Sequence, residues 1–125
     1  MKQAVESDKV PRPIGPYSVG VAAGELVFVS GQGPTDPGTG HVEKEDVKEA
    51  TRRTLENVKA ILETAGVTMA HVVKCNVYLL DMKNFPLMNE VYKTFFAAPY
   101  PARTTIQAAG LPNGIPVEIE CIAHR

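Results

Sequence analysis

Apolar residues follow two different spacings along the chain, and the first of them predicts β-strands. Five stretches are rich in β-branched and other apolar residues and are bounded by turn-forming residues, which is typical of strands. These stretches are residues 19–21, 26–30, 72–80, 103–108 and 116–123. The first two flank the turn Ala23-Gly24-Glu25 and predict a hairpin, whereas the glycine- and proline-rich residues 32–40 predict a loop.

The second spacing, with apolar residues three or four positions apart, predicts two α-helices. The longer helix extends from about Lys44 to Ala65, and Gly66 is a natural stop. The shorter helix begins near Phe85, with Pro86 in its first turn, where a proline is tolerated. The residues expected on the apolar faces are Val47, Ala50, Thr54, Val58, Ile61, Leu62 and Ala65 in the longer helix, and Leu87, Val91 and Phe95 in the shorter one.

These elements predict an α+β sandwich, a sheet of five or six strands with both helices on one face. A chain of 125 residues is expected to form one domain, residues 1–125. The segment 1–13 fits either an edge strand or a flexible arm.

The opposite face of this sheet carries more apolar residues than a solvent-exposed face needs. In the last strand Glu118 and Glu120 alternate with apolar residues, as in a strand with one face in water. The stretches 26–30 and 72–80 are instead apolar on both faces. Two explanations stay open: scattered exposed apolar residues, which are common, or burial against further copies of the chain. Burial would place both glutamates at or near a subunit boundary.

Composition narrows the class of protein. Hydrophobic residues make up 44% and charged residues 22% of the chain, as in ordinary globular proteins. The formal net charge of −1 argues against a protein that binds nucleic acid or an anionic membrane surface. The first residues show no signal-peptide core, and no stretch is long enough to span a bilayer. We therefore expect a cytoplasmic protein, in which Cys75 and Cys121 pack in the core without a disulfide.

Most motifs for catalysis and cofactor binding are absent. His41, His71 and His124 lack the paired spacing of metal ligands, so we expect no metal site. Gly31-Gln32-Gly33 lacks the third glycine and the following helix of a dinucleotide-binding loop, and no phosphate-binding loop occurs. Ser30 ends a strand with no evident histidine to activate it.

Arg103 and Glu118 remain as candidates. They lie on two predicted strands joined by the turn 111–114, so we expect an antiparallel pair that brings them close together. A guanidinium can bind a carboxylate through two parallel hydrogen bonds, and a glutamate can direct a water molecule. An Arg103–Glu118 ion pair that only stabilises the sheet fits the same spacing. Other polar residues beside apolar runs are Tyr17, Ser30 and Asn89.

Many short motifs occur in a fixed order over nearly the whole chain. They are Gly15-Pro16-Tyr17-Ser18, Phe28-Val29-Ser30-Gly31-Gln32-Gly33, Pro37-Gly38-Thr39-Gly40, Leu55-Glu56-Asn57, Ala65-Gly66, Leu80-Asp81-Met82 with Phe85, Asn89-Glu90-Val91-Tyr92 with Phe95-Phe96, Pro101-Ala102-Arg103, Leu111-Pro112 and Val117-Glu118-Ile119-Glu120. Their order and spacing resemble the reactive intermediate deaminases, the RidA or YjgF-like family. So many ordered matches are hard to obtain by chance.

The resemblance implies a chorismate-mutase-like α+β fold with a mixed sheet, assembled as a homotrimeric barrel with pockets at the subunit interfaces. It also implies hydrolysis of enamines and imines such as 2-aminoacrylate and 2-aminocrotonate. The products would be ammonia and a 2-keto acid, and the deaminase itself would use no cofactor.

The resemblance also assigns site residues. Arg103 matches the arginine that binds the substrate carboxylate, and Glu118 matches the acid that positions the attacking water. The positions that match pocket residues are Tyr17, Ser30, Gly31 and Asn89. At Thr105 many relatives have a cysteine whose backbone contacts the ligand, so the threonine removes thiol chemistry there without removing the contact.

Two other functions fit the same resemblance. One is a ligand-binding or regulatory trimer without turnover, and the other is a deaminase for a larger substrate, such as an aminomuconate or a product of pyrimidine breakdown. Relatives have also been linked to RNA cleavage, but the acidic balance of this chain argues against that activity.

Overall fold

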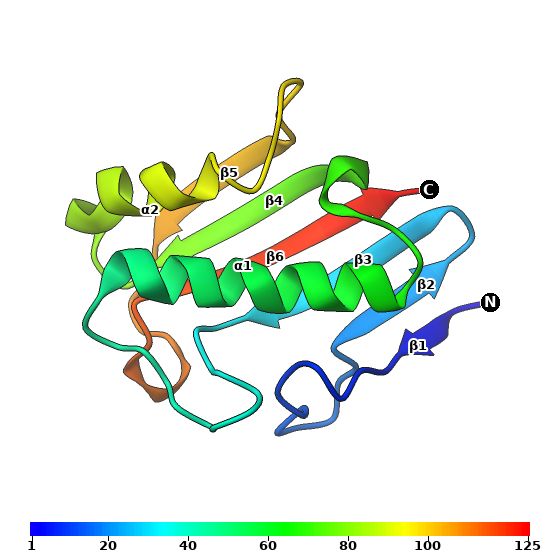
Figure 1. Cartoon of the computed structure of the whole chain (residues 1–125), viewed down its shortest axis with the longest axis horizontal. Helices are drawn as coiled ribbons and strands as arrows, with labels where there is room; N and C mark the ends of the chain where they lie inside the picture. Colours follow the sequence, from blue (N-terminus) through cyan, green and yellow to red (C-terminus); the bar gives the residue numbers. More distant parts are fainter.

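Six strands form one mixed sheet, and two α-helices pack on one of its faces (Figure 1). The computed structural model describes all residues from Met1 to Arg125. The strands are β1 (Gln3–Val5), β2 (Gly20–Ala23), β3 (Leu26–Gln32), β4 (Val72–Leu79), β5 (Ala102–Gln107) and β6 (Val117–His124), and the helices are α1 (Val47–Thr64) and α2 (Phe85–Tyr92). The predicted α+β class is confirmed, and no helix has the length and apolarity needed to cross a membrane.

Helix α1 forms close to its predicted position. The side chain of Asp46 accepts a hydrogen bond from the backbone N–H of Glu49 (3.1 Å), which caps the first turn. Gly66 follows the helix with a φ of +83°, a left-handed conformation that commonly ends helices. The capping residue explains why the helix begins at Val47 and not at Lys44.

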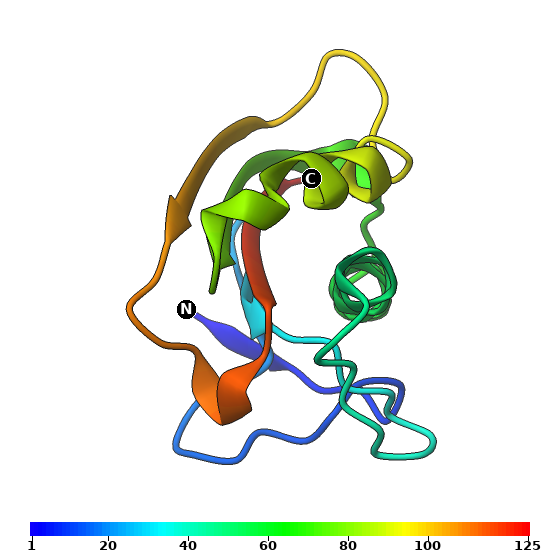
Figure 2. The same cartoon turned by 90° about the vertical axis from the view of Figure 1, so that its left-hand side faces the viewer.

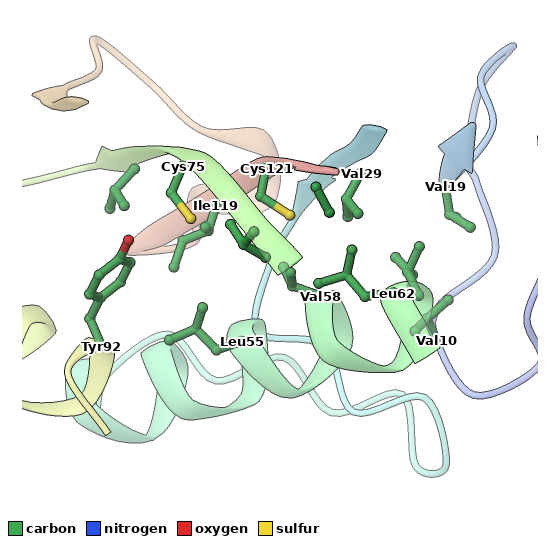
Figure 3. Close-up of a cluster of buried hydrophobic side chains, with 14 of the residues drawn as sticks. Val10, Val19, Val29, Leu55, Val58, Leu62, Cys75, Tyr92, Ile119 and Cys121 are labelled. Atoms are coloured by element: carbon green, nitrogen blue, oxygen red, sulfur yellow. The ribbon is translucent and has the colours of Figure 1, made fainter. Parts of the chain in front are cut away.

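The core lies between α1 and the sheet. Leu55 and Val58 of α1 point toward Cys75, Ile119 and Cys121 of the sheet (Figure 3). Both cysteines are buried and free, and burial raises the pKa of both thiols. The prediction that they pack in the core is confirmed.

The prediction that Leu87, Val91 and Phe95 form the apolar face of α2 was wrong. Leu87 is 39% exposed, whereas Met88 and Tyr92 are buried, at 0% and 6% exposure. Met88 and Tyr92 are four positions apart and therefore share one face of the helix. Phe95 lies beyond the end of α2 and packs against the core from there.

The pairing of the last two strands was also wrong. Strand β5 runs parallel to β4, and β6 lies between β3 and β4 in the sheet order β1-β2-β3-β6-β4-β5. The segment 108–116 therefore does not close a hairpin but carries the chain from one side of β4 to the other. Strand β1 pairs with β2, so the N-terminal segment supplies an edge strand.

The face of the sheet away from the helices is uncovered. In the edge-on view of Figure 2, no α-helix lies on the side that faces away from α1. Strand β6 alternates as predicted, with Glu118 and Glu120 on this open face. The open face also presents Phe28 and Ile106, which are 39% and 47% exposed.

Candidate active site

Arg103 is held from several sides beneath α2. Its Cζ atom lies 4.7 Å from the ring centroid of Tyr92 and 5.5 Å from that of Phe85, both within range of a cation–π interaction. Its Nη1 donates a hydrogen bond to Oδ1 of Asn89 (2.8 Å) and lies 3.9 Å from the sulfur of Met88. The guanidinium is half-buried and has a defined orientation.

No carboxylate of the chain forms an ion pair with Arg103. The ion pairs that the chain does form join His41 to Glu43, Lys48 to Glu90, and Arg52 to Glu49. All hydrogen bonds that the Arg103 side chain donates leave from Nη1, so Nε and Nη2 have no acceptor within the chain. These two atoms form the edge of a guanidinium that binds a carboxylate bidentately.

The support of Arg103 comes from residues that the sequence analysis did not assign to it. Phe85, Asn89 and Tyr92 are spaced i, i+4 and i+7 on α2 and so line one side of the helix. This spacing was the available signal, but Leu87 and Val91 suggested a different face. Thr105 follows Arg103 on the same face of β5, and its hydroxyl is buried without a hydrogen-bond partner.

The other predicted site residues meet on the open face of the sheet. Tyr17, Ser30, Gly31 and Glu118 line a groove of about 680 Å³. A Cβ atom on Gly31 would lie 2.8 Å from Cδ of Glu118, so only glycine leaves the carboxyl group its present place. Gly31 therefore makes room for the glutamate, a role that the sequence did not show.

A β-bulge shapes this groove. The register between β3 and β6 shifts after Val29 and resumes at Gln32, which leaves Ser30 and Gly31 in the irregular part. The hydroxyl of Ser30 donates to the carbonyl of Ser18 (2.6 Å), and Nε2 of Gln32 donates to the carbonyl of Ser30 (3.2 Å). These two hydrogen bonds, to Ser18 and from Gln32, fix the position of Ser30 in the bulge.

Glu118 is half-buried and forms no hydrogen bond within the chain. Its burial and, to a smaller extent, the negative charge of Glu120 raise the pKa of its carboxyl group. An acid whose pKa is raised toward neutrality is a better general base once it is ionised.

Arg103 and Glu118 lie on opposite faces of the sheet, so the expectation that an antiparallel pair brings them close together was wrong, and the alternative of an ion pair within the sheet does not form either. Arg103 pairs in register with Cys75, which faces the helices, whereas Glu118 pairs with Tyr78, three positions further along β4. Because side chains alternate along a strand, an odd separation places the two on different faces. Arg103, Asn89 and Thr105 form one half-site, and Tyr17, Ser30, Gly31 and Glu118 form the other. No group of three or more His, Cys, Asp or Glu residues is placed to hold a metal ion.

Comparisons with known proteins agree over the whole chain. Residues 7–125 match the family model described as Endoribonuclease L-PSP. A RutC family protein of Pyrococcus horikoshii is 46% identical over 100% of this chain and 99% of its own length. The 2-iminobutanoate/2-iminopropanoate deaminase of Salmonella typhimurium is 43% identical over 100% of this chain and 99% of its own length. The crystal structure of Escherichia coli TdcF with bound serine is 44% identical over 98% of both chains, with a TM-score of 0.94. The chain belongs to this family, that of RidA, YjgF and TdcF.

Proposed function

We propose that the protein hydrolyses 2-imino acids and their enamine tautomers, such as 2-aminocrotonate and 2-aminoacrylate, to 2-keto acids and ammonia. The observation that carries this proposal is the half-buried guanidinium of Arg103, which has a fixed orientation but no anionic partner. A small carboxylate supplies that partner. The deaminase named above, at 43% identity, supports the same substrate class.

The proposed mechanism needs only positioning and one proton-transferring group. Arg103 binds the substrate carboxylate through Nε and Nη2 and so fixes the imine carbon. Glu118 accepts a proton from a water molecule, whose oxygen attacks that carbon, and passes the proton to the imine nitrogen, which gives a neutral carbinolamine. Glu118 then accepts the proton of the new hydroxyl group and delivers it to the amino nitrogen as the carbon–nitrogen bond breaks and the carbonyl forms, so that ammonia and the 2-keto acid are released. One general acid–base group typically contributes about 10²–10⁴-fold to a rate.

We propose that the two half-sites complete each other between copies of the chain. The position of Arg103 and Glu118 on opposite faces of the sheet supports an arrangement in which the open face of one copy meets the β5 side of the next. The uncovered apolar residues of the open face, among them Phe28 and Ile106, support burial there. We propose a homotrimer with three such sites, with Tyr17, Ser30, Gly31, Asn89 and Thr105 lining the bound substrate beside the two catalytic residues.

A coupled assay tests the activity. A pyridoxal-phosphate threonine dehydratase generates 2-aminocrotonate in the presence of semicarbazide, which traps the imine. We expect wild type to reduce formation of the semicarbazone and Arg103→Ala not to do so. Arg52→Ala, which removes an exposed arginine of α1, is the matched control and should behave as wild type. Failure of folded wild type to divert the imine would contradict the proposal.

Mixing two variants, each with a strongly reduced activity, tests the shared site. Arg103→Ala and Glu118→Gln are unfolded and refolded together, so that mixed oligomers form. If each site takes its arginine and its glutamate from different subunits, random assembly restores about one quarter of the sites. No recovery in mixed oligomers would show that both residues act within one chain.

A ligand-binding protein without turnover is the second candidate, because the TdcF structure is described with bound serine. Calorimetric titration with serine and with 2-ketobutyrate would show binding in that case, together with no effect in the coupled assay. A deaminase for a larger imine would instead bind 2-ketobutyrate weakly and turn over the larger substrate.

A further inference from the structure

Two carboxylates share the groove on the open face, and the mechanism above uses only one of them. Glu118 and Glu120 are two positions apart on β6 and line the same groove. A negative charge on Glu120 repels one on Glu118 and so disfavours the ionised form of Glu118. A second acid at this position therefore affects the first.

Tyr78 holds the second acid in place. It lies on β4 opposite Glu118 in the strand register, and its hydroxyl donates a short hydrogen bond to Oε1 of Glu120. This hydrogen bond, more than burial, raises the pKa of Tyr78 to about 12, so the hydroxyl stays protonated and remains a donor at neutral pH. Glu120 is thus a fixed acceptor, whereas Glu118 has no such partner.

Within one chain, few other charged groups face Glu118. In the proposed trimer Arg103 of the neighbouring copy also faces it, and this positive charge is the same in wild type and in the Glu120 and Tyr78 variants compared below. Strand β3 contributes Ser30, Gly31 and Gln32 to the groove, none of them charged, and β4 contributes Tyr78 opposite Glu118. Arg12 and Tyr17, from the segment before β2, line the same groove and are exposed to solvent. Glu120 is the only other acid that lines the groove.

We propose that Glu120, fixed by the hydroxyl of Tyr78, is a positioning residue whose charge adds to the effect of burial and shifts the pH at which Glu118 gives up its proton. The negative charge of Glu120 makes ionised Glu118 a stronger base, which favours removal of a proton from water. The catalytic consequence rests on the proposed deaminase function, but the electrostatic coupling does not.

The test measures Glu118 directly. Protein labelled with ¹³C at the glutamate carboxyl carbons is titrated by NMR, and the Glu118 signal is assigned by its loss in Glu118→Gln. We expect its titration midpoint to fall to lower pH in Glu120→Gln, because a repelling charge is removed. Glu63→Gln, which removes an exposed charge of α1, is the matched control and should leave the midpoint unchanged.

Tyr78→Phe is a second test, since it keeps the charge of Glu120 but removes its donor. A freed Glu120 can turn toward solvent, so we expect the Glu118 midpoint to fall by less than in Glu120→Gln. An unchanged midpoint in Glu120→Gln would overturn the proposal, and an unchanged midpoint in Tyr78→Phe would remove Tyr78 from it.

Turnover separates this inference from the proposed function. If Glu118 acts as the base, kcat/KM falls as the pH drops through its pKa, and this acidic limb should move to lower pH in Glu120→Gln by as much as the NMR midpoint does. A shifted midpoint in a protein without turnover would contradict the deaminase function and leave the coupling intact. Turnover with an unshifted midpoint would contradict the coupling alone.

Discussion

The two half-sites are built in opposite ways. Arg103 is surrounded by its own chain: two aromatic rings lie within 5.5 Å of its Cζ, and an amide oxygen accepts its Nη1 proton at 2.8 Å. Glu118 lies over a glycine on an uncovered face and has no hydrogen-bond partner. The chain thus fixes the cation by itself and leaves the acid free.

This difference matches the work proposed for each group. An arginine that binds a carboxylate does not change its charge during the reaction, so a rigid setting costs nothing at the transition state and aids orientation. An acid that accepts and returns a proton needs room for water and a pKa within reach of the working pH. The arginine half is built by the fold of one chain, whereas in the proposed trimer the glutamate half is completed by assembly.

Arg103→Ala is the change with the largest expected effect. It removes the group that we propose orients the substrate, and orientation can supply roughly 7–11 kcal/mol of a barrier, so we expect kcat/KM to fall by about 10⁴-fold or more. In Glu118→Gln we expect kcat/KM to fall less, by about 10²–10⁴-fold, so that this variant keeps measurable activity. Steady-state kinetics in the coupled assay measure both.

Arg103→Lys sharpens this prediction, because it keeps the charge but loses the planar pair of donors. We expect kcat/KM of Arg103→Lys to fall almost as far as that of Arg103→Ala. Full activity in the lysine variant would contradict bidentate binding, and a larger loss in Glu118→Gln than in Arg103→Ala would reverse the comparison of the two halves.

Gly31→Ala perturbs the glutamate half-site without replacing Glu118 itself. The new Cβ would overlap the Glu118 carboxyl group, which is the flexible end of its side chain, so the group moves and the fold stays stable. A displacement of this size can cost about 10²-fold in kcat. Gly110→Ala, where nothing lies within 4 Å of the added atom, is the matched control. A large fall in melting temperature would show a structural role instead.

The elements dominated by one periodicity were predictable from the sequence. The three- to four-residue spacing located α1, and the alternation in β6 placed Glu118 and Glu120 on one face. Helix α2 has apolar residues on several sides, so the pattern alone did not select the face that carries Met88 and Tyr92. That choice is made by the sheet beneath the helix.

The strand order was not predictable, and part of the site depends on it. Neighbouring strands in sequence usually pair, and the turn at 111–114 suggested a hairpin. Common hairpin loops have about 2–5 residues, and the segment 108–116 is longer. This length was the feature of the sequence that argued against a hairpin. The sequence selected Arg103 and Glu118 as candidates, but the opposite faces they occupy and the contact of Tyr78 with Glu120 follow only from the register of β4.

Asn89→Ala tests the support of the arginine half. It removes the acceptor of Nη1, and a hydrogen bond to a charged group is worth about 1.5–3 kcal/mol. Because the aromatic rings remain, we expect KM to rise by about 10-fold with a smaller change in kcat. Asn84→Ala, just before α2, removes an amide with no capping hydrogen bond and should have little effect. An unchanged KM in Asn89→Ala would show that the rings alone orient Arg103.

Tyr92→Phe should have the smallest effect. The ring that lies 4.7 Å from the Arg103 Cζ is kept, and the hydroxyl that is lost has no oxygen or nitrogen partner in the core, only the weakly hydrogen-bonding thiol of Cys75 beside it. Figure 3 shows this hydroxyl pointing toward the sheet. Removing an unpaired buried hydroxyl is expected to leave KM unchanged and to raise the free energy of unfolding by up to about 1 kcal/mol. Tyr100→Phe, at a 58% exposed tyrosine, is the matched control for both measurements.

Tyr92→Leu then isolates the ring. The loss of a cation–π interaction costs about 0.5–2 kcal/mol, so KM should rise several-fold although the residue stays apolar. A rise in KM in the leucine variant but not in the phenylalanine variant assigns the support of Arg103 to the aromatic face. If both variants bind substrate as wild type does, the rings pack in the core without orienting the guanidinium. Asn89 would then be the residue that makes the arginine half rigid.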